Sequence, residues 1–247
     1  MASSIYRHKP LFDTRLDFEF GAWKVGRNLS SKIRKQEDPQ GGFMYERHEV
    51  YEATRVDQPS NTPDVIKIKK QITFWSNHRY SEPSDGVYRE IYNLSQLEDC
   101  RRIPKLLGYA VERQVFSDEL PGGYNAYIVM QKVPGENLHF FDTLRKEEQN
   151  RIRIAFIEAL WELQSRHFTH WDPRRENIMW ELQSGQCSIV NLENAEKHTE
   201  RTKDDVCLDA MEQLEYWGLF EGQYEGVLFF EKDKLLLEDL KFRLYIK

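Results

Sequence analysis

The stretch that decides the fold is His170-Trp171-Asp172-Pro173-Arg174-Arg175-Glu176-Asn177-Ile178-Met179. It directly follows the clearest helical pattern of the chain, residues 146–164, in which apolar side chains recur on one face. Within the stretch, His170, Asp172 and Asn177 are the candidate functional residues. A lone histidine is more often a hydrogen-bonded scaffold residue than a catalyst, so the interpretation depends on what else the chain carries.

Three further segments accompany this stretch in a fixed order. Val65-Ile66-Lys67-Ile68 places a lysine inside an apolar strand, and Glu90 follows on a helix expected over residues 84–97. Ser188-Ile189-Val190-Asn191-Leu192-Glu193 is a short apolar strand that ends in polar residues. A lysine and a glutamate alone are usually a surface ion pair worth at most about 1 kcal/mol. It is the ordered set that indicates a site.

This order and spacing resembles the protein-kinase-like superfamily. The pattern His170-x-Asp172-x-x-x-x-Asn177 matches its catalytic loop at all three polar positions. Tyr127-Ile128-Val129-Met130-Gln131-Lys132 resembles the strand that leads into the hinge beside the adenine. The resemblance covers about residues 28–195 and implies an α+β fold with two lobes, a β-rich N-lobe and a shortened α-rich C-lobe.

The resemblance also implies a role for each residue. Lys67 would hold nucleotide phosphates while Glu90 orients it, and His170 and Asn191 would belong to the same substrate- or nucleotide-binding region. Asp172 would accept or orient a proton on the attacking group. In the same family pattern, Asn177 would hold a metal ion.

The sequence departs from the family where the metal and the phosphates would bind. Asn191 stands at the position of the metal-binding acid, and an amide removes a full negative charge beside a hard dication. Glu193 stands where the family has a glycine. The only candidate for a glycine-rich phosphate loop is Pro39-Gln40-Gly41-Gly42, which is more simply a hairpin turn. Only 54 residues follow Glu193, and they hold no Ala-Pro-Glu motif. An ordinary protein kinase is therefore not expected, and no metal ligands are assigned.

The order of the patterns predicts three parts: an arm over residues 1–28, a β-rich lobe over 29–132 and an α-rich lobe over 133–247. The arm is expected to be irregular, with Phe18, Phe20 and Trp23 packed on the body. Strands are expected over residues 30–36, 43–56, 65–73, 103–111 and 125–132, and helices over 84–97 and 146–164.

Composition excludes several classes of protein. The 247 residues are 40% hydrophobic and 31% charged, which is typical of a folded globular chain. No apolar run is long enough to cross a membrane, and no secretory signal opens the chain. Three widely spaced cysteines argue against a disulfide framework and favour a reducing, cytoplasmic location.

Three functions fit these features. The first is a transferase on a reused kinase fold, similar in size and pattern to the fungal arginine-containing cyclodipeptide synthases of secondary metabolism. These join amino acids from aminoacyl-tRNA, and Asp172 or Glu193 would be the base for an attacking amine, with Asn177 beside them. A cleft whose carboxylates lack a dication would also suit a guanidinium.

A tRNA partner would need a basic track, and four clusters of basic residues could supply one, although each is more simply a solvated face. The clusters are Lys32-Arg34-Lys35, Lys67-Lys69-Lys70, Arg101-Arg102-Lys105 and Arg174-Arg175.

The other two functions differ in how much of the kinase chemistry they retain. An ATP-dependent small-molecule kinase would retain Lys67, Glu90, Asp172 and Asn177 in their family roles, with ATP and magnesium as cofactors and Asn191 as a tolerated change. A pseudokinase binding module would instead use its surface, and its pocket would be a vestige.

Overall fold

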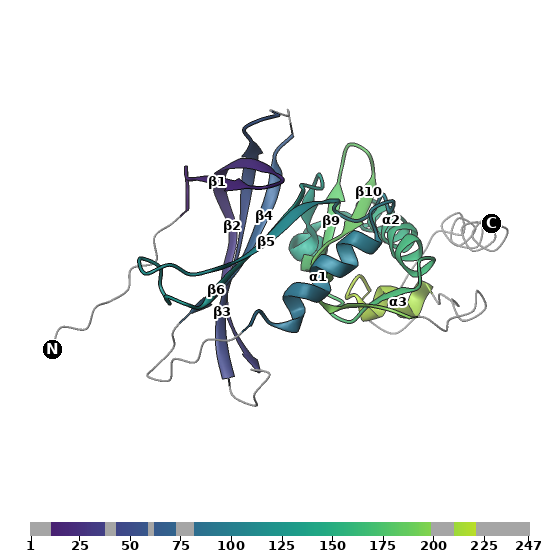
Figure 1. Ribbon diagram of the computed structural model, residues 1–247. Coiled ribbons are helices and arrows are strands. Elements are labelled where there is room, and N and C mark those ends of the chain that lie inside the picture. The colour runs from purple at the N-terminus through teal and green to yellow at the C-terminus, as the bar shows by residue number, and fades with distance from the viewer. Residues whose placement is uncertain (1–10, 38–42, 59–61, 73–81, 199–209, 221–247) are drawn as a thin grey trace. The chain divides into compact units, whose positions relative to one another are not determined.

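The computed structural model describes residues 11–37, 43–58, 62–72, 82–198 and 210–220 (Figure 1). The chain divides into two compact units, residues 1–96 with 105–132 and residues 97–104 with 133–247. The mixed helix-and-strand class expected from the sequence is confirmed. No helix in the described part of the chain is long and apolar enough to cross a membrane.

The first unit is built on a six-stranded antiparallel sheet with the strand order β1-β2-β3-β4-β6-β5 (Figure 1). Its strands are β1 (Arg15–Phe18), β2 (Gly21–Glu37), β3 (Phe43–Arg55), β4 (Asp64–Ile72), β5 (Leu106–Arg113) and β6 (Tyr124–Gln131). The central strands β4 and β6 are buried along most of their length, as their apolar runs predict.

One face of this sheet carries an aromatic and aliphatic core. Trp23, Tyr51, Ile66, Ile68 and Val129 are buried members of it, and Phe18 and Phe20 pack against them. The two phenylalanine rings stack with their centroids 5.0 Å apart.

The expectation of an irregular arm is wrong over residues 15–18 and from Gly21 onward, which are strands of the sheet. The physical reason is that Trp23 and Val25 alternate with Lys24. This pattern buries the apolar pair and leaves the lysine exposed.

The helix of the first unit is α1 (Asp85–Gln96), which buries Val87, Glu90, Ile91 and Leu94. These positions are three and four residues apart, so they lie on one face of the helix. That face carries a charge as well as apolar groups, because Glu90 reaches β4. The helix begins with Asp85, whose negative charge suits the positive end of a helix dipole.

The second unit packs short strands around one long helix. Its elements are β7 (Glu136–Asn137), η1 (Leu138–Thr143), α2 (Lys146–Gln164), β8 (Phe168–His170), η2 (Arg175–Asn177), β9 (Ile178–Glu181), β10 (Gln186–Ile189), η3 (Leu192–Asn194), β11 (Ala195–Lys197) and α3 (Ala210–Tyr216). The strands form a three-stranded sheet, β10-β9-β7, and a two-stranded ribbon, β11-β8. Buried Ile152, Phe156 and Leu160 of α2 supply the centre of the core.

The expected elements agree with the structure at most positions. The helix over residues 146–164 has the expected bounds, and the helix over 84–97 is one residue shorter at each end. The strand expected over 103–111 instead runs from Leu106 to Arg113. The candidate phosphate loop at 39–42 falls outside the described residues.

Candidate functional site

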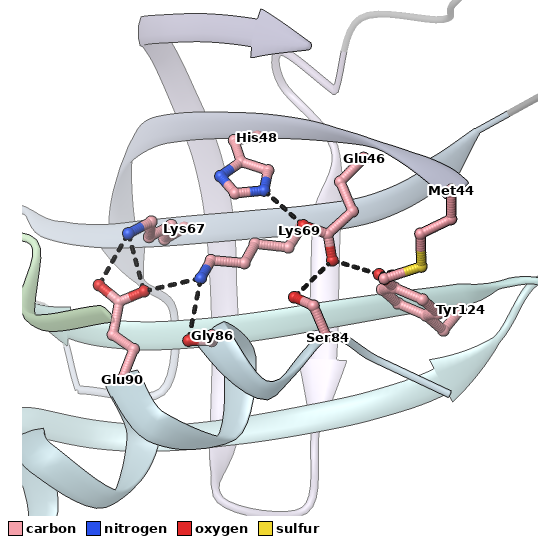
Figure 2. Close-up of polar contacts among 9 residues, drawn as sticks. All are labelled: Met44, Glu46, His48, Lys67, Lys69, Ser84, Gly86, Glu90 and Tyr124. Carbon is pink, nitrogen blue, oxygen red and sulfur yellow. Dashed lines mark hydrogen bonds and ion pairs between the residues drawn. The ribbon is translucent and has the colours of Figure 1, made fainter. Parts of the chain in front are cut away.

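In the first unit, Lys67 and Glu90 form the ion pair expected from the sequence. The Lys67 ammonium lies 2.8 Å from one carboxylate oxygen of Glu90 and 2.7 Å from the other (Figure 2). Lys67 comes from the middle of β4 and Glu90 from the second turn of α1, so the pair ties the helix to the sheet. Both side chains are buried, so this is not the surface ion pair that would be the ordinary case.

A second lysine, Lys69, shares the same carboxylate. Its ammonium lies 3.2 Å from Glu90 and donates a hydrogen bond to the Gly86 carbonyl at 3.2 Å (Figure 2). Lys69 is fully buried. The cluster Lys67-Lys69-Lys70 is therefore neither a solvated face nor part of an exposed basic track, because two of its three members are buried ion-pair partners of one helix residue.

A buried polar network beside Lys69 was not anticipated from the sequence. The Glu46 carboxylate accepts a hydrogen bond from Ser84 at 2.8 Å and another from Tyr124, and it lies 2.7 Å from the ring of His48 (Figure 2). Burial by itself would raise the pKa of Glu46, but the bonds from His48, Tyr124 and Ser84 lower it to about 2. The network fixes Ser84, at the start of α1, against β3.

In the second unit, His170 is a scaffold residue. Its Nε2 donates to the carbonyls of Asn191 at 3.1 Å and Val190 at 3.3 Å, and its Nδ1 accepts from the backbone N–H of Asp172 at 3.2 Å. Burial lowers the pKa of His170, which agrees with a neutral ring that donates from one nitrogen and accepts at the other. The histidine thus holds the loop that bears Asp172 against the segment that bears Asn191.

Asp172 is a partly exposed carboxylate with two local partners. Arg174 donates to its Oδ2 in an ion pair. Asn177 Nδ2 lies 2.8 Å from its backbone carbonyl and 3.3 Å from its Oδ2. Partial burial raises the pKa of Asp172, but the bonds from Arg174 and Asn177 outweigh it, and the pKa is lowered below its usual 3.8. The carboxylate is therefore ionised at neutral pH.

Asn191 and Glu193 lie on the segment that follows β10. Asn191 has a left-handed backbone (φ 66°, ψ 57°), a conformation that asparagine tolerates better than most residues. Its neighbour Val190 donates a backbone hydrogen bond to the Asn177 carbonyl at 2.9 Å, which joins this segment to the Asp172 loop. Glu193 is buried.

These residues do not fit a standard magnesium site. The Asn191 amide contributes no charge, and Asp172 is already paired with Arg174. Hard dications prefer carboxylate oxygens. Across the described ranges, no three histidine, cysteine or carboxylate side chains gather as a metal site.

The structure thus gathers the candidate residues into two groups. Lys67 and Glu90 meet in the first unit, and His170, Asp172, Asn177, Asn191 and Glu193 belong to the second.

The remaining basic clusters differ in their partners. Arg174 pairs with Asp172, Arg175 with Asp142, and Arg102 lies 3.5 Å from Glu158. On β2, Lys32 and Lys35 have exposed side chains, and the Lys35 ammonium lies 3.5 Å from the centroid of the Phe43 ring.

Comparison with known proteins finds similarity among solved structures and none among family models or curated sequences. No family model matches the chain, and no curated protein sequence matches it. Among solved structures, the chain is similar to the kinase PK-1 of Cydia pomonella granulovirus, with a TM-score of 0.44 and 16% sequence identity. The alignment covers 68% of this chain and 53% of that kinase, so the chain spans about half of that protein's length.

Proposed function

We propose that the chain is a group-transfer enzyme on a two-lobed kinase-like fold, in which Asp172 holds the attacking group. The observation that carries this proposal is the Asp172 loop itself. A carboxylate, kept ionised by Arg174 and Asn177, stays partly exposed beside a segment where Asn191 replaces an acid. Such a loop suits transfer to an amine or a hydroxyl without a standard dication site.

The chemistry of Asp172 is electrostatic more than basic. A carboxyl group whose pKa lies below 3.8 is a weak proton acceptor at neutral pH. It does, however, attract an amine and stabilise the positive charge that develops on nitrogen during attack on a carbonyl. Glu193 is a second carboxylate on the neighbouring segment, although its burial makes it the less accessible of the two.

The donor that we propose is an aminoacyl-tRNA, and the product is a cyclic dipeptide that contains arginine. The amine of one aminoacyl group attacks the ester carbonyl of the other and releases one tRNA hydroxyl. The new terminal amine then attacks the remaining ester, which closes the ring and releases the second tRNA. Each attack gives up one proton, and Asp172 would stabilise the nitrogen until that proton leaves.

Mass spectrometry of extracts from a host that expresses the chain tests this proposal. We expect a new cyclic dipeptide with arginine, which Asp172→Asn abolishes. Glu176→Gln is the matched control, because Glu176 is an exposed carboxylate on the same loop. If the Asp172→Asn variant makes as much cyclic dipeptide as the parent, the proposed role of Asp172 is wrong. If the parent chain makes no new cyclic dipeptide, the proposed synthase activity is wrong.

A second candidate function is an ATP-dependent small-molecule kinase, and the buried Lys67–Glu90 ion pair favours it. Kinases need this type of pair to hold nucleotide phosphates. If the chain is such a kinase, ATP with magnesium should raise its melting temperature by mass action, and Lys67→Met should remove the effect. No shift with the parent chain would exclude this candidate. A binding module is indicated if both assays are silent and a partner protein co-purifies.

A further inference from the structure

The Glu90 carboxylate has two lysine partners with unequal access to solvent. The Lys67 side chain keeps 8% of its surface exposed, whereas Lys69 keeps 1% and Glu90 keeps 2%. Lys67 is therefore the most accessible member of the trio. Lys69 is enclosed between the sheet and the start of α1 (Figure 2).

The two lysines also differ in how they are anchored. Lys69 holds α1 at two points one turn apart, the Gly86 carbonyl and the Glu90 carboxylate. On the sheet, it lies directly opposite His48 in the pairing of β3 and β4, next to the Glu46 network. Movement of the Lys67 ammonium would leave these contacts in place.

The second lysine lowers the free-energy cost of moving Lys67 away from Glu90. If Glu90 had one cation only, a ligand that drew Lys67 away would leave a buried carboxylate without a counter-charge, which is strongly unfavourable. With Lys69 present, Glu90 keeps one positive partner while Lys67 turns to a ligand. The net charge of the trio is positive, which favours an anion beside Lys67, its most accessible member.

We propose that Lys69 is a positioning residue that keeps Glu90 neutralised and thereby releases Lys67 to bind a phosphate group of the donor substrate. This inference rests on the phosphate-binding role that the kinase candidate gives Lys67, but it does not depend on which phosphate-bearing donor the enzyme uses. Lys69 itself does not touch the ligand.

Calorimetric titration with inorganic tripolyphosphate at constant ionic strength tests the proposal on the full chain. We expect the parent to bind and Lys67→Met to lose binding. Lys69→Met should weaken binding at least about tenfold although Lys67 is intact, because Lys67 must then stay with Glu90. Lys70→Met is the matched control, since Lys70 is the next lysine along β4 on the opposite face, and it should bind like the parent.

A rescue experiment separates positioning from simple structural damage. Adding Glu90→Gln to Lys69→Met removes the carboxylate that needs neutralising, so tripolyphosphate affinity should return to near the parental value. Lys69→Arg should also retain binding.

Unchanged affinity in Lys69→Met, or failure of the double variant to recover, would overturn the proposal. Loss of binding in Lys70→Met as in Lys69→Met would overturn it as well. Absence of tripolyphosphate binding by the parent would remove the phosphate site at Lys67 altogether. A cyclic dipeptide in the metabolite assay would still be detected if only the role of Lys69 were wrong.

Discussion

Two neighbours on its own loop, Arg174 and Asn177, lower the pKa of Asp172 against the effect of partial burial. Arg174 reaches back two residues to form the ion pair, so the loop carries its own counter-ion. The same pairing raises the pKa of the Arg174 guanidinium. Asp172 therefore stays ionised to a lower pH than an ordinary aspartate does.

Replacing Arg174 by methionine should shift the acid limb of activity. Without the guanidinium, the pKa of Asp172 rises, so its ionised form is lost at a higher pH on acidification. The pH profile of product formation should therefore fall off earlier from the acid side, while the alkaline side stays unchanged. An acid limb at the parental position would show that Arg174 does not set the charge of Asp172.

The lowered pKa of Glu46 predicts that the stability of the fold depends on pH. Its pKa is lowered from an ordinary 4.5 to about 2, so its contribution to folding is fully present above pH 4.5 and is lost as the pH falls toward 2. The shift corresponds to about 3 kcal/mol. Denaturant unfolding of the parent at pH 6 and pH 2.5 should show this loss, and Glu46→Gln should show a smaller difference between the two. An equal pH dependence in both proteins would contradict the assignment.

At the scale of elements, β7 and β9 approach each other closely at one glycine. Gly135 has a φ of 95°, and a β-carbon there would lie 2.1 Å from the Trp180 carbonyl oxygen. Both the positive φ and the contact exclude a side chain, so the paired residues Glu136 and Trp180 depend on this glycine.

The variant Gly135→Ala should lose about 2 kcal/mol or more of unfolding free energy, measured by denaturant titration. Gly86→Ala is the opposite case. Its β-carbon would meet no atom closer than 3.8 Å, and alanine favours the helix, so stability should stay equal or rise slightly. A smaller loss at Gly135 than at Gly86 would refute the close approach.

Elements with a local period could be predicted from the sequence. The long helix α2 is an example, because its apolar residues repeat with a period near 3.6. Strands β1 and early β2 were not predicted, because the alternation of buried Trp23 and Val25 with exposed Lys24 spans only three residues.

The candidate site was predicted only where its groups are motif residues. Lys67 with Glu90 and the loop of Asp172 followed from order and spacing. Glu46 could not be found in this way, because its partners Ser84 and Tyr124 are 38 and 78 residues away. Lys69 looked like a surface residue, since a lysine is rarely buried without a partner that only the tertiary structure supplies.

At the scale of the whole molecule, the net charge of −6 does not attract a nucleic acid. Any tRNA binding would therefore depend on a local patch of basic residues. Among the four basic clusters, those on β4 and around Arg102 and Arg174 have carboxylate partners within the fold. Lys32 and Lys35 of β2 have exposed side chains, and we take them as the candidates for an RNA contact. Lys32→Glu with Lys35→Glu should weaken tRNA binding and reduce its salt dependence, measured by filter binding across salt concentrations. Unaltered binding would place the contact elsewhere.

The unequal lengths of β1 and β2 have a consequence for colloidal behaviour. Strand β2 has 17 residues, but β1 pairs only with its first four, from Gly21 to Lys24. Val25 also bonds to Asp13 and Thr14, and the strand that pairs with the later part of β2 is β3, on one side. The other side of β2 is therefore a margin of the sheet, and sheet margins can pair with another chain. Lys32 and Lys35 lie along this margin, where repulsion between like charges discourages two molecules from joining edge to edge. Even without a nucleic acid, these lysines would disfavour edge-to-edge pairing of two copies of the chain.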